Sequence, residues 1–359
     1  MIYGHTLDQL GDLIIKQNAE KRDFIAPATR LRFASTPTVE PTLSFDLGGQ
    51  AIDASLTPLA TRQIGSWAGI PAKYLERLSE PENRHLLQSN VQHWLSEAGD
   101  SKRLVRMLSN GHNVVRAFLS DRYRPLDNYD LAMHILPRLR QGGMEVKSSA
   151  LTDTRIYLQA VDTRLVAAIE HKDSSALDEV FAGVVVSNSE VGAGSLSIEP
   201  MIYRLRCTNG MIAGTGLRRA HLGRSLGSGD DAFEVFSDAT KQLTDAALWA
   251  QVGDTLEHAL SESTFRAIVA KMQTAADTTL PANPTYIVEV TAQNLGLSTD
   301  EKDAVMRHLF TGGDGLTAYA LANAVTRTAQ DARSYDRAIE LERLGSDVLA
   351  YTADTFSIN

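Results

Sequence analysis

The spacing of apolar residues changes along the chain, and this change limits the possible folds more than any other feature of the sequence. Apart from a helical stretch at residues 127–139, apolar and polar residues alternate between about residues 103 and 188, as in RLVRMLSN, NVVRAFLSD and TRIYLQAVD. A period of two is typical of strands. After Asp230 the apolar residues recur at helical spacing. The sequence therefore predicts an α+β protein: a central, mostly antiparallel sheet with helices on one face, followed by a helical C-terminal region.

The first 100 residues mix both patterns. TRLRFAS, TLSFDL and QAIDASL predict a small sheet with a hairpin turn at residues 47–50. LTPLATRQIGSWAGIPAKYLERL, residues 56–78, predicts two helices separated by a Gly-Ile-Pro break. This pair is similar to a DNA-binding helix-turn-helix, but the mixed charges of Lys73, Glu76 and Arg77 favour a plain helical hairpin packed on a core. The apolar residues expected in that core are Ile64, Trp67, Ile70, Tyr74 and Leu78.

Charge divides the chain in the same way as the spacing of apolar residues. The net charge of −9 is the sum of −3 over residues 1–100, +5 over residues 101–225 and −11 over residues 226–359. We therefore expect three parts: an N-terminal small sheet with a helical hairpin (1–100), a central basic α+β domain (101–229) and an acidic helical C-terminal region (230–359). A basic part between acidic flanks is typical of a protein with one face for a polyanion.

The basic residues of the central part are densest between residues 204 and 224. No acidic residue occurs between Glu199 and Asp230, and glycines at positions 210, 214, 216 and 223 would let the backbone approach an anion closely. Two further segments interleave tyrosine with arginine, at residues 122–124 and on the strand around residue 157. Arginines that bind phosphates beside a tyrosine that stacks on a base are typical of single-stranded DNA binding.

These segments define the candidate nucleic-acid-binding residues. They are Arg122, Tyr123, Arg124, Arg155, Tyr157, Tyr203, Arg204, Arg206, Arg218, Arg219, His221 and Arg224. The alternative is structural: the tyrosines would be half-buried sheet residues, with arginine side chains covering them.

Patterns that would indicate catalysis are weak. The nine histidines show no metal-binding spacing, and the single Cys207 makes neither a zinc site nor an intrachain disulfide and fits a small core residue. The GAGSLS segment has no Walker lysine. We therefore expect no cofactor and no metal site, except that distant carboxylates could together hold Mg²⁺. The acidic residues considered for that role are Asp121, Asp127, Glu190 and Glu199.

Three stretches carry a family resemblance: VSNSEVGAGSLSIEPMIYRLRCTNGMI, RAFLSDRYRPLDNYDL and LANAVTRTAQDARSYDRAIELERLGSDVL. They resemble a phage- and plasmid-borne family of unknown function, domain-of-unknown-function family nine-three-two, in which the first motif begins with isoleucine rather than Val186. The resemblance implies a mobile-element origin, the cytoplasm of a bacterial host, and a role in DNA metabolism or defence evasion. It implies no catalytic residue.

Together these observations predict a phage- or mobile-element-derived protein that binds nucleic acid, with single-stranded DNA in DNA metabolism or recombination as the first interpretation. The alternatives are a carboxylate- and Mg²⁺-dependent enzyme acting on nucleic acid or nucleotide, and an inhibitor of a host factor. No apolar run approaches the roughly 20 residues that cross a bilayer, so we expect no membrane partner. The stretch Leu316–Leu349 either closes the core of a monomer or contacts a second subunit in a homo-oligomer.

Overall fold

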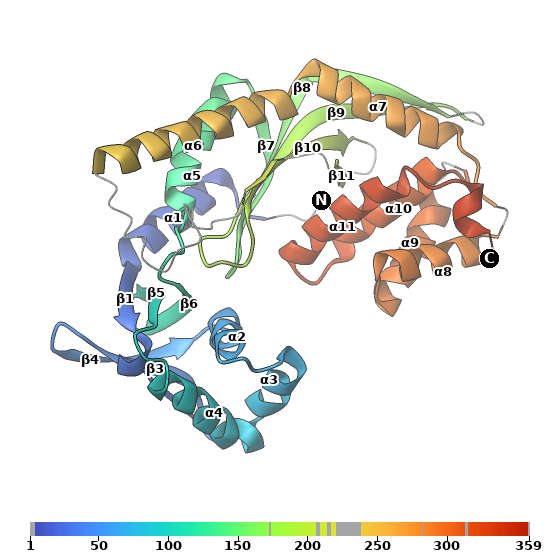
Figure 1. Cartoon of the computed structure of the whole chain (residues 1–359). Helices are drawn as coiled ribbons and strands as arrows, with labels where there is room; N and C mark the ends of the chain where they lie inside the picture. The colour runs from blue at the N-terminus through green and yellow to red at the C-terminus, as the bar shows by residue number, and fades with distance from the viewer. Residues whose placement is uncertain are drawn as a thin grey trace.

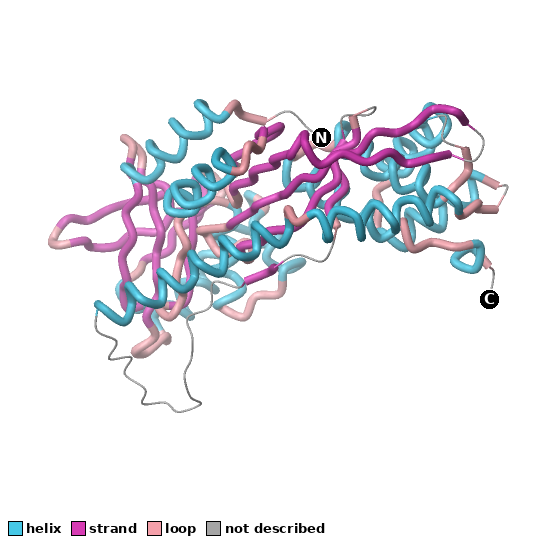
Figure 2. Tube along the Cα trace, turned by 90° about the horizontal axis from the view of Figure 1, so that it is seen from above, coloured by secondary structure: helices cyan, strands magenta, loops and turns pink. Residues whose placement is uncertain are grey.

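The computed structural model describes residues 4–171, 174–205, 209–213, 217–219, 238–281, 283–312 and 315–357. Two six-stranded sheets and a helical C-terminal region form the fold, which confirms the α+β class. Figure 2 shows an elongated molecule with the first sheet at one end. Among the described residues, none of the helices combines the length and apolar composition that crossing a bilayer requires.

The first sheet has the strand order β1-β5-β6-β4-β3-β2. Its strands are β1 (Lys21–Pro27), β2 (Arg32–Thr36), β3 (Val39–Leu47), β4 (Gln50–Leu56), β5 (Lys102–Ser109) and β6 (Asn113–Ser120). The predicted hairpin at residues 47–50 is present, because Gly48 and Gly49 turn the chain between β3 and β4 with positive φ, and Gly111 turns a second hairpin between β5 and β6 in the same way. A boundary at residue 100 is wrong for this sheet, because β5 pairs with β1 and β6 pairs in parallel with β4.

The predicted helical hairpin packs on the first sheet. The helices here are α2 (Pro58–Trp67), α3 (Ala72–Ser79) and α4 (Arg84–Ser96). Ile64, Ile70 and Leu78 are buried in the core of this lobe, as expected, whereas Tyr74 is 45% exposed. Leu75 takes the core position on α3 instead, and its side chain lies against Gly65 of α2, where a Cβ would come within 2.6 Å.

The second sheet has the order β11-β10-β9-β8-β7, with β12 paired to β10. Its strands are β7 (Glu145–Leu151), β8 (Ile156–His171), β9 (Ser174–Asn188), β10 (Leu196–Arg204), β11 (Asn209–Ile212) and β12 (Leu217–Arg219). Neighbouring residues on one strand are buried on both faces: Val184 and Val186 pack with helices α1, α5 and α6, and Val185 packs with α11. These helices are α1 (Leu7–Glu20), α5 (Asn128–Gln141), α6 (Asp238–Ala259) and α11 (Tyr335–Val348).

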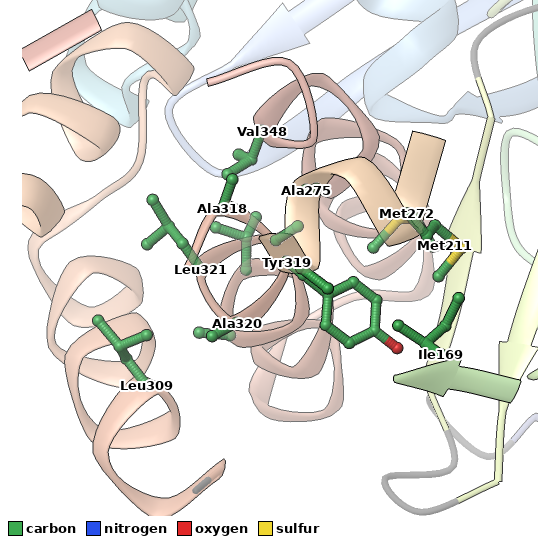
Figure 3. Packing of buried hydrophobic residues seen from close by; sticks show 14 of the residues in the cluster. Ile169, Met211, Met272, Ala275, Leu309, Ala318, Tyr319, Ala320, Leu321 and Val348 are labelled. Carbon is green, nitrogen blue, oxygen red and sulfur yellow. The ribbon is translucent and has the colours of Figure 1, made fainter. Parts of the chain in front are cut away.

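The C-terminal helices share a core with the second sheet. Helices α6 and α7 lie along one side of the sheet (Figure 1) and α11 packs on the other, while α10 contacts both α7 and α11 at the end of the sheet near β11. Figure 3 shows Tyr319 of α10 between Met272 of α7 and Ile169 and Met211 of the sheet. The helical region is therefore packed onto the second sheet and is not a separate unit. The remaining helices are α7 (Glu262–Asp277), α8 (Pro284–Leu295), α9 (Thr299–Gly312), α10 (Ala318–Thr328) and the short η1 (Ala28–Arg30), η2 (Pro81–Asn83), η3 (Ala329–Asp331) and η4 (Ala353–Phe356).

Helix α10 lies in the stretch for which the sequence left two interpretations open, closure of a monomer core or contact with a second subunit. Ten of its residues are buried, and its alanines allow α7, α9 and α11 to approach closely. At the contact with α11, a Cβ on Gly345 would come within 2.2 Å of the Thr326 side chain. This part of the stretch Leu316–Leu349 closes the core of the single chain.

Polar groups also join α11 to the second sheet. Glu199 of β10 is fully buried, and Arg343 donates to both of its carboxylate oxygens at 3.0 and 2.5 Å. At the preceding residue of α11, the side-chain amide of Gln159 donates to Glu342 at 2.5 Å, and burial raises the pKa of the Glu342 carboxyl. We call Gln159, Glu199, Glu342 and Arg343 the α11 cluster.

Candidate nucleic-acid interface

The loop of residues 189–195, which connects β9 to β10, lies where the two sheets meet, and we call it the joint loop. Gln63 of α2 holds it from the first sheet's side, because its amide donates to the Val191 carbonyl at 2.8 Å while accepting from the Phe118 amide at 2.8 Å. From the other side, Arg155 donates to the Ala193 carbonyl at 2.7 Å. Gly192 turns the loop with a φ of 77°, a conformation that other residues rarely adopt.

A buried set of ion pairs fixes this junction. Arg106 of β5 is 1% exposed and donates to Asp23 at 3.0 Å, to Asp127 at 2.6 Å and to the Glu190 carbonyl at 2.5 Å. Lys21 of β1 forms a further ion pair with Asp127. Since Asp127 precedes α5, these contacts join the first sheet to a helix that packs on the second.

Glu190 makes a second connection across the same junction. One carboxylate oxygen accepts from Arg116 of β6 at 2.6 Å. The other accepts from the backbone N–H of Asn128, at the beginning of α5, at 2.9 Å. A carboxylate at a helix N-terminus is stabilised by the exposed amides and the helix dipole. We call Lys21, Asp23, Arg106, Arg116, Asp127 and Glu190 the joint cluster.

The titration of this region follows from its contacts. Burial by itself would raise the pKa of Asp127, but Arg106 and Lys21 outweigh it and hold that pKa below its ordinary value. Burial raises the pKa of Tyr123 to about 12, and its hydroxyl donates to the Ser189 carbonyl at 3.3 Å. Tyr123 is thus a half-buried contact of the joint loop.

Five of the predicted residues come together at the end of the second sheet beside the joint loop. Arg122 and Arg124 are exposed on either side of Tyr123, and Arg155 is half-buried just before β8. The register of β12 places the backbone of Arg218 opposite Ser197, and that of Arg219 opposite Leu196, at the beginning of β10. We call this set the basic end; it consists of Arg122, Arg124, Arg155, Arg218 and Arg219.

The basic end has an excess of positive charge. Two exposed carboxylates, Asp121 and Asp153, lie in the same loops as Arg122 and Arg155. Within the described residues, Arg122 and Arg124 have no ion-pair partner. Exposed guanidinium groups of this kind can bind phosphate oxygens in a bidentate manner.

Three predicted residues lie elsewhere and have structural contacts. Tyr157 is 3% exposed, and its hydroxyl donates to Asp336 of α11 at 2.7 Å. Arg204 is buried at the opposite end of β10, where it pairs with Asp178 and lies over the Tyr319 ring. Tyr203 is half-buried on the face that packs with α11. For these residues the structural alternative applies, because their side chains are taken up by the core.

The remaining predicted residues, Arg206, His221 and Arg224, lie outside the described residues, as does Cys207. The signal that could have identified the joint cluster is the position of Arg106 and Arg116. Each lies in the middle of an otherwise apolar strand, where an arginine is buried only if it has acidic partners.

The carboxylates considered for Mg²⁺ do not form one site. Glu199 is bound by Arg343 at α11, whereas Asp127 and Glu190 are bound by arginines at the junction. In the described part of the chain, no group of three or more His, Cys, Asp or Glu side chains is placed to hold a metal ion.

Comparisons with protein-family models, with curated proteins and with solved structures found no match to this chain. The family resemblance and the functions that it implies therefore stay predictions.

Proposed function

We propose that this protein binds nucleic acid, that its partner is single-stranded DNA, and that it serves DNA metabolism or recombination of a phage or other mobile element in a bacterial cytoplasm. The observation that carries the proposal is the basic end. Three separate segments that carry arginines, residues 122–124, residue 155 and residues 218–219, have their backbones beside one loop.

The chemistry of the basic end fits a phosphate backbone. Each guanidinium offers a planar set of donors to phosphate oxygens, and its positive charge attracts the strand from a distance. The backbone of the joint loop is bonded from both sides, so the arginines beside it project from a backbone of fixed position. A backbone of fixed position lowers the ordering cost of binding.

The first test is the salt dependence of binding in a double variant. Arg122→Ala/Arg124→Ala removes two exposed cations that have no ion-pair partner within the described residues. We expect weaker binding to a labelled single strand. The slope of log affinity against log salt should also become about 1.4 units shallower, at roughly 0.7 per phosphate contact. Fluorescence anisotropy at several salt concentrations measures both quantities.

The matched control is Arg140→Ala/Lys271→Ala, which removes two exposed cations at the end of α5 and on α7, away from the joint loop. This control should bind like the wild type. A wild-type protein that does not bind single-stranded DNA at low salt would overturn the proposal. So would an unchanged slope in Arg122→Ala/Arg124→Ala.

A further inference from the structure

The basic end can bind phosphates, but among the described residues beside it there is no exposed aromatic ring on which a base could stack. The three tyrosines expected to do so are engaged: Tyr157 is 3% exposed, Tyr123 bonds to the joint loop, and Tyr203 packs towards α11. Proteins that bind single strands combine a positive surface with aromatic side chains that stack on successive bases. A stacking residue should therefore lie next to the basic end.

Helix α3 has an exposed tyrosine between two basic residues. Leu75 and Leu78 are buried in the core, where α3 contacts α2 and α4, so Lys73, Tyr74 and Arg77 fall on the outer side of the helix, and all three are exposed, as is Glu76. Neither Lys73 nor Arg77 makes an ion pair within the part of the chain that the structure describes. An aromatic ring between two cations is the arrangement that holds a base and its flanking phosphates.

Helix α2 connects α3 to the basic end. Leu59 of α2 packs with Tyr123 and Ala193, and Gln63 bonds to the joint loop. At the other end of the same helix, Gly65 lies against Leu75 of α3. Figure 1 shows α2 between β6 and α3. The basic end and α3 thus contact opposite ends of the same helix.

We propose that Tyr74 is the base-stacking residue for a single strand whose phosphates bind at the basic end, with Lys73 and Arg77 binding the phosphates on either side of the stacked base. The inference rests on the proposed function. It adds that the bound single-stranded DNA runs from the second sheet to helix α3, which belongs to the core of the first sheet. It requires a single strand, because a base inside a duplex is already stacked and paired.

Two other exposed aromatic residues lack this setting. Trp94 of α4 is 48% exposed, but its ring contacts His93, and no lysine or arginine lies within three residues of it in sequence. Phe310 of α9 is 68% exposed, and nearby Arg307 is paired with Asp331. Trp94 is a matched control, because it has nearly the same exposure as Tyr74 and belongs to the same lobe.

The test is binding of labelled oligothymidine to Tyr74→Leu, Tyr74→Phe and Trp94→Leu. Loss of one base–aromatic contact should weaken binding by Tyr74→Leu about tenfold, with an unchanged salt slope because no charge is removed. Tyr74→Phe keeps the ring and should bind like the wild type, as should Trp94→Leu. Because Tyr74 is exposed, we expect Tyr74→Leu to fold, and its urea unfolding midpoint checks this.

A second variant tests the flanking phosphates independently. Lys73→Gln/Arg77→Gln should make the salt slope about 1.4 units shallower. The inference is overturned if Tyr74→Leu binds like the wild type, if Trp94→Leu weakens binding as much, or if Lys73→Gln/Arg77→Gln leaves the slope unchanged. If the wild type binds and only Arg122→Ala/Arg124→Ala lowers the slope, the proposed function survives and Tyr74 is excluded. If the wild type does not bind, both proposals fail.

Discussion

The joint cluster and the α11 cluster both bury acidic side chains between a sheet and another element, but they compensate for that burial differently. In the joint cluster, three acidic residues share two buried arginines and a lysine, and the pKa of Asp127 is lowered. In the α11 cluster, Glu342 is 1% exposed, bonds to the neutral amide of Gln159, and has a raised pKa. Every acid of the joint cluster thus has a cationic partner, whereas the α11 cluster combines the ion pair of Arg343 and Glu199 with Glu342, whose pKa is raised by burial.

The largest expected effect is the loss of Arg106. Arg106→Met leaves Asp23 and Asp127 without their buried partner, which should lower the free energy of unfolding by about 3–5 kcal/mol. Urea unfolding measures the change. The control is Arg333→Met, which removes an ion pair with Asp300 whose side chains are 89% and 77% exposed, and which should change stability by less than about 1 kcal/mol. Equal effects of the two substitutions would contradict the importance of charge at the junction.

The next effect is the opposite pH dependence of the two clusters. The folded-state pKa of Asp127 lies below its ordinary value of 3.8, so its stabilisation is complete above that pH and is lost as the pH falls. The folded-state pKa of Glu342 lies above 4.5, so its favourable contribution is present below pH 4.5 and is lost as the pH rises through the raised pKa.

Two isosteric variants separate these contributions in urea unfolding at a series of pH values. Asp127→Asn should lower stability at neutral pH by about 2 kcal/mol, since charge-assisted hydrogen bonds are lost, and should weaken the decline in acid. Glu342→Gln should change neutral stability by less than about 1 kcal/mol and weaken the decline on the alkaline side. The comparison fails if both variants alter the same side of the pH profile.

The smallest effect compares one tyrosine from each region. Tyr157 donates to the Asp336 carboxylate at 2.7 Å near α11, whereas Tyr123 donates to the Ser189 carbonyl at 3.3 Å at the joint loop. Hydrogen bonds to charged acceptors contribute more, so Tyr157→Phe should cost about 1.5 kcal/mol and Tyr123→Phe about 0.5 kcal/mol. Thermal or urea unfolding of the two variants measures the loss of stability. A larger loss of stability in Tyr123→Phe than in Tyr157→Phe would contradict this ranking.

The sequence predicted those features of the fold that depend on neighbouring residues. Alternation and the Gly-containing turn identified the hairpin of β3 and β4 and the strands from β5 to β9, but not β10. Alternation does not specify which strand a partner belongs to, so the pairing of β1 with β5 and the parallel pairing of β4 with β6 were not predicted. The helices on the second face of the second sheet were missed for the same reason.

The candidate site shows the same limit. Arg204 and Arg122 have similar neighbours in sequence, each next to a tyrosine, but Asp178 lies beside Arg204 on the adjacent strand and Arg204 is buried. Tyr74 has the spacing of a core residue relative to Leu78, yet the core position goes to Leu75 because Gly65 leaves room for it. In both places the outcome depends on a residue from another element.

The pairing of β1 with β5 also determines the order in which the chain can fold. Lys21 lies opposite Leu108 in that pair, so β1 has no partner until about 90 further residues have been synthesised. Until then its backbone groups are an unprotected edge that can pair with another chain. A fragment that ends near residue 100 would keep this edge permanently open, and aggregation is its expected fate. The shortest fragment that can complete the first sheet must extend through β6, to Ser120.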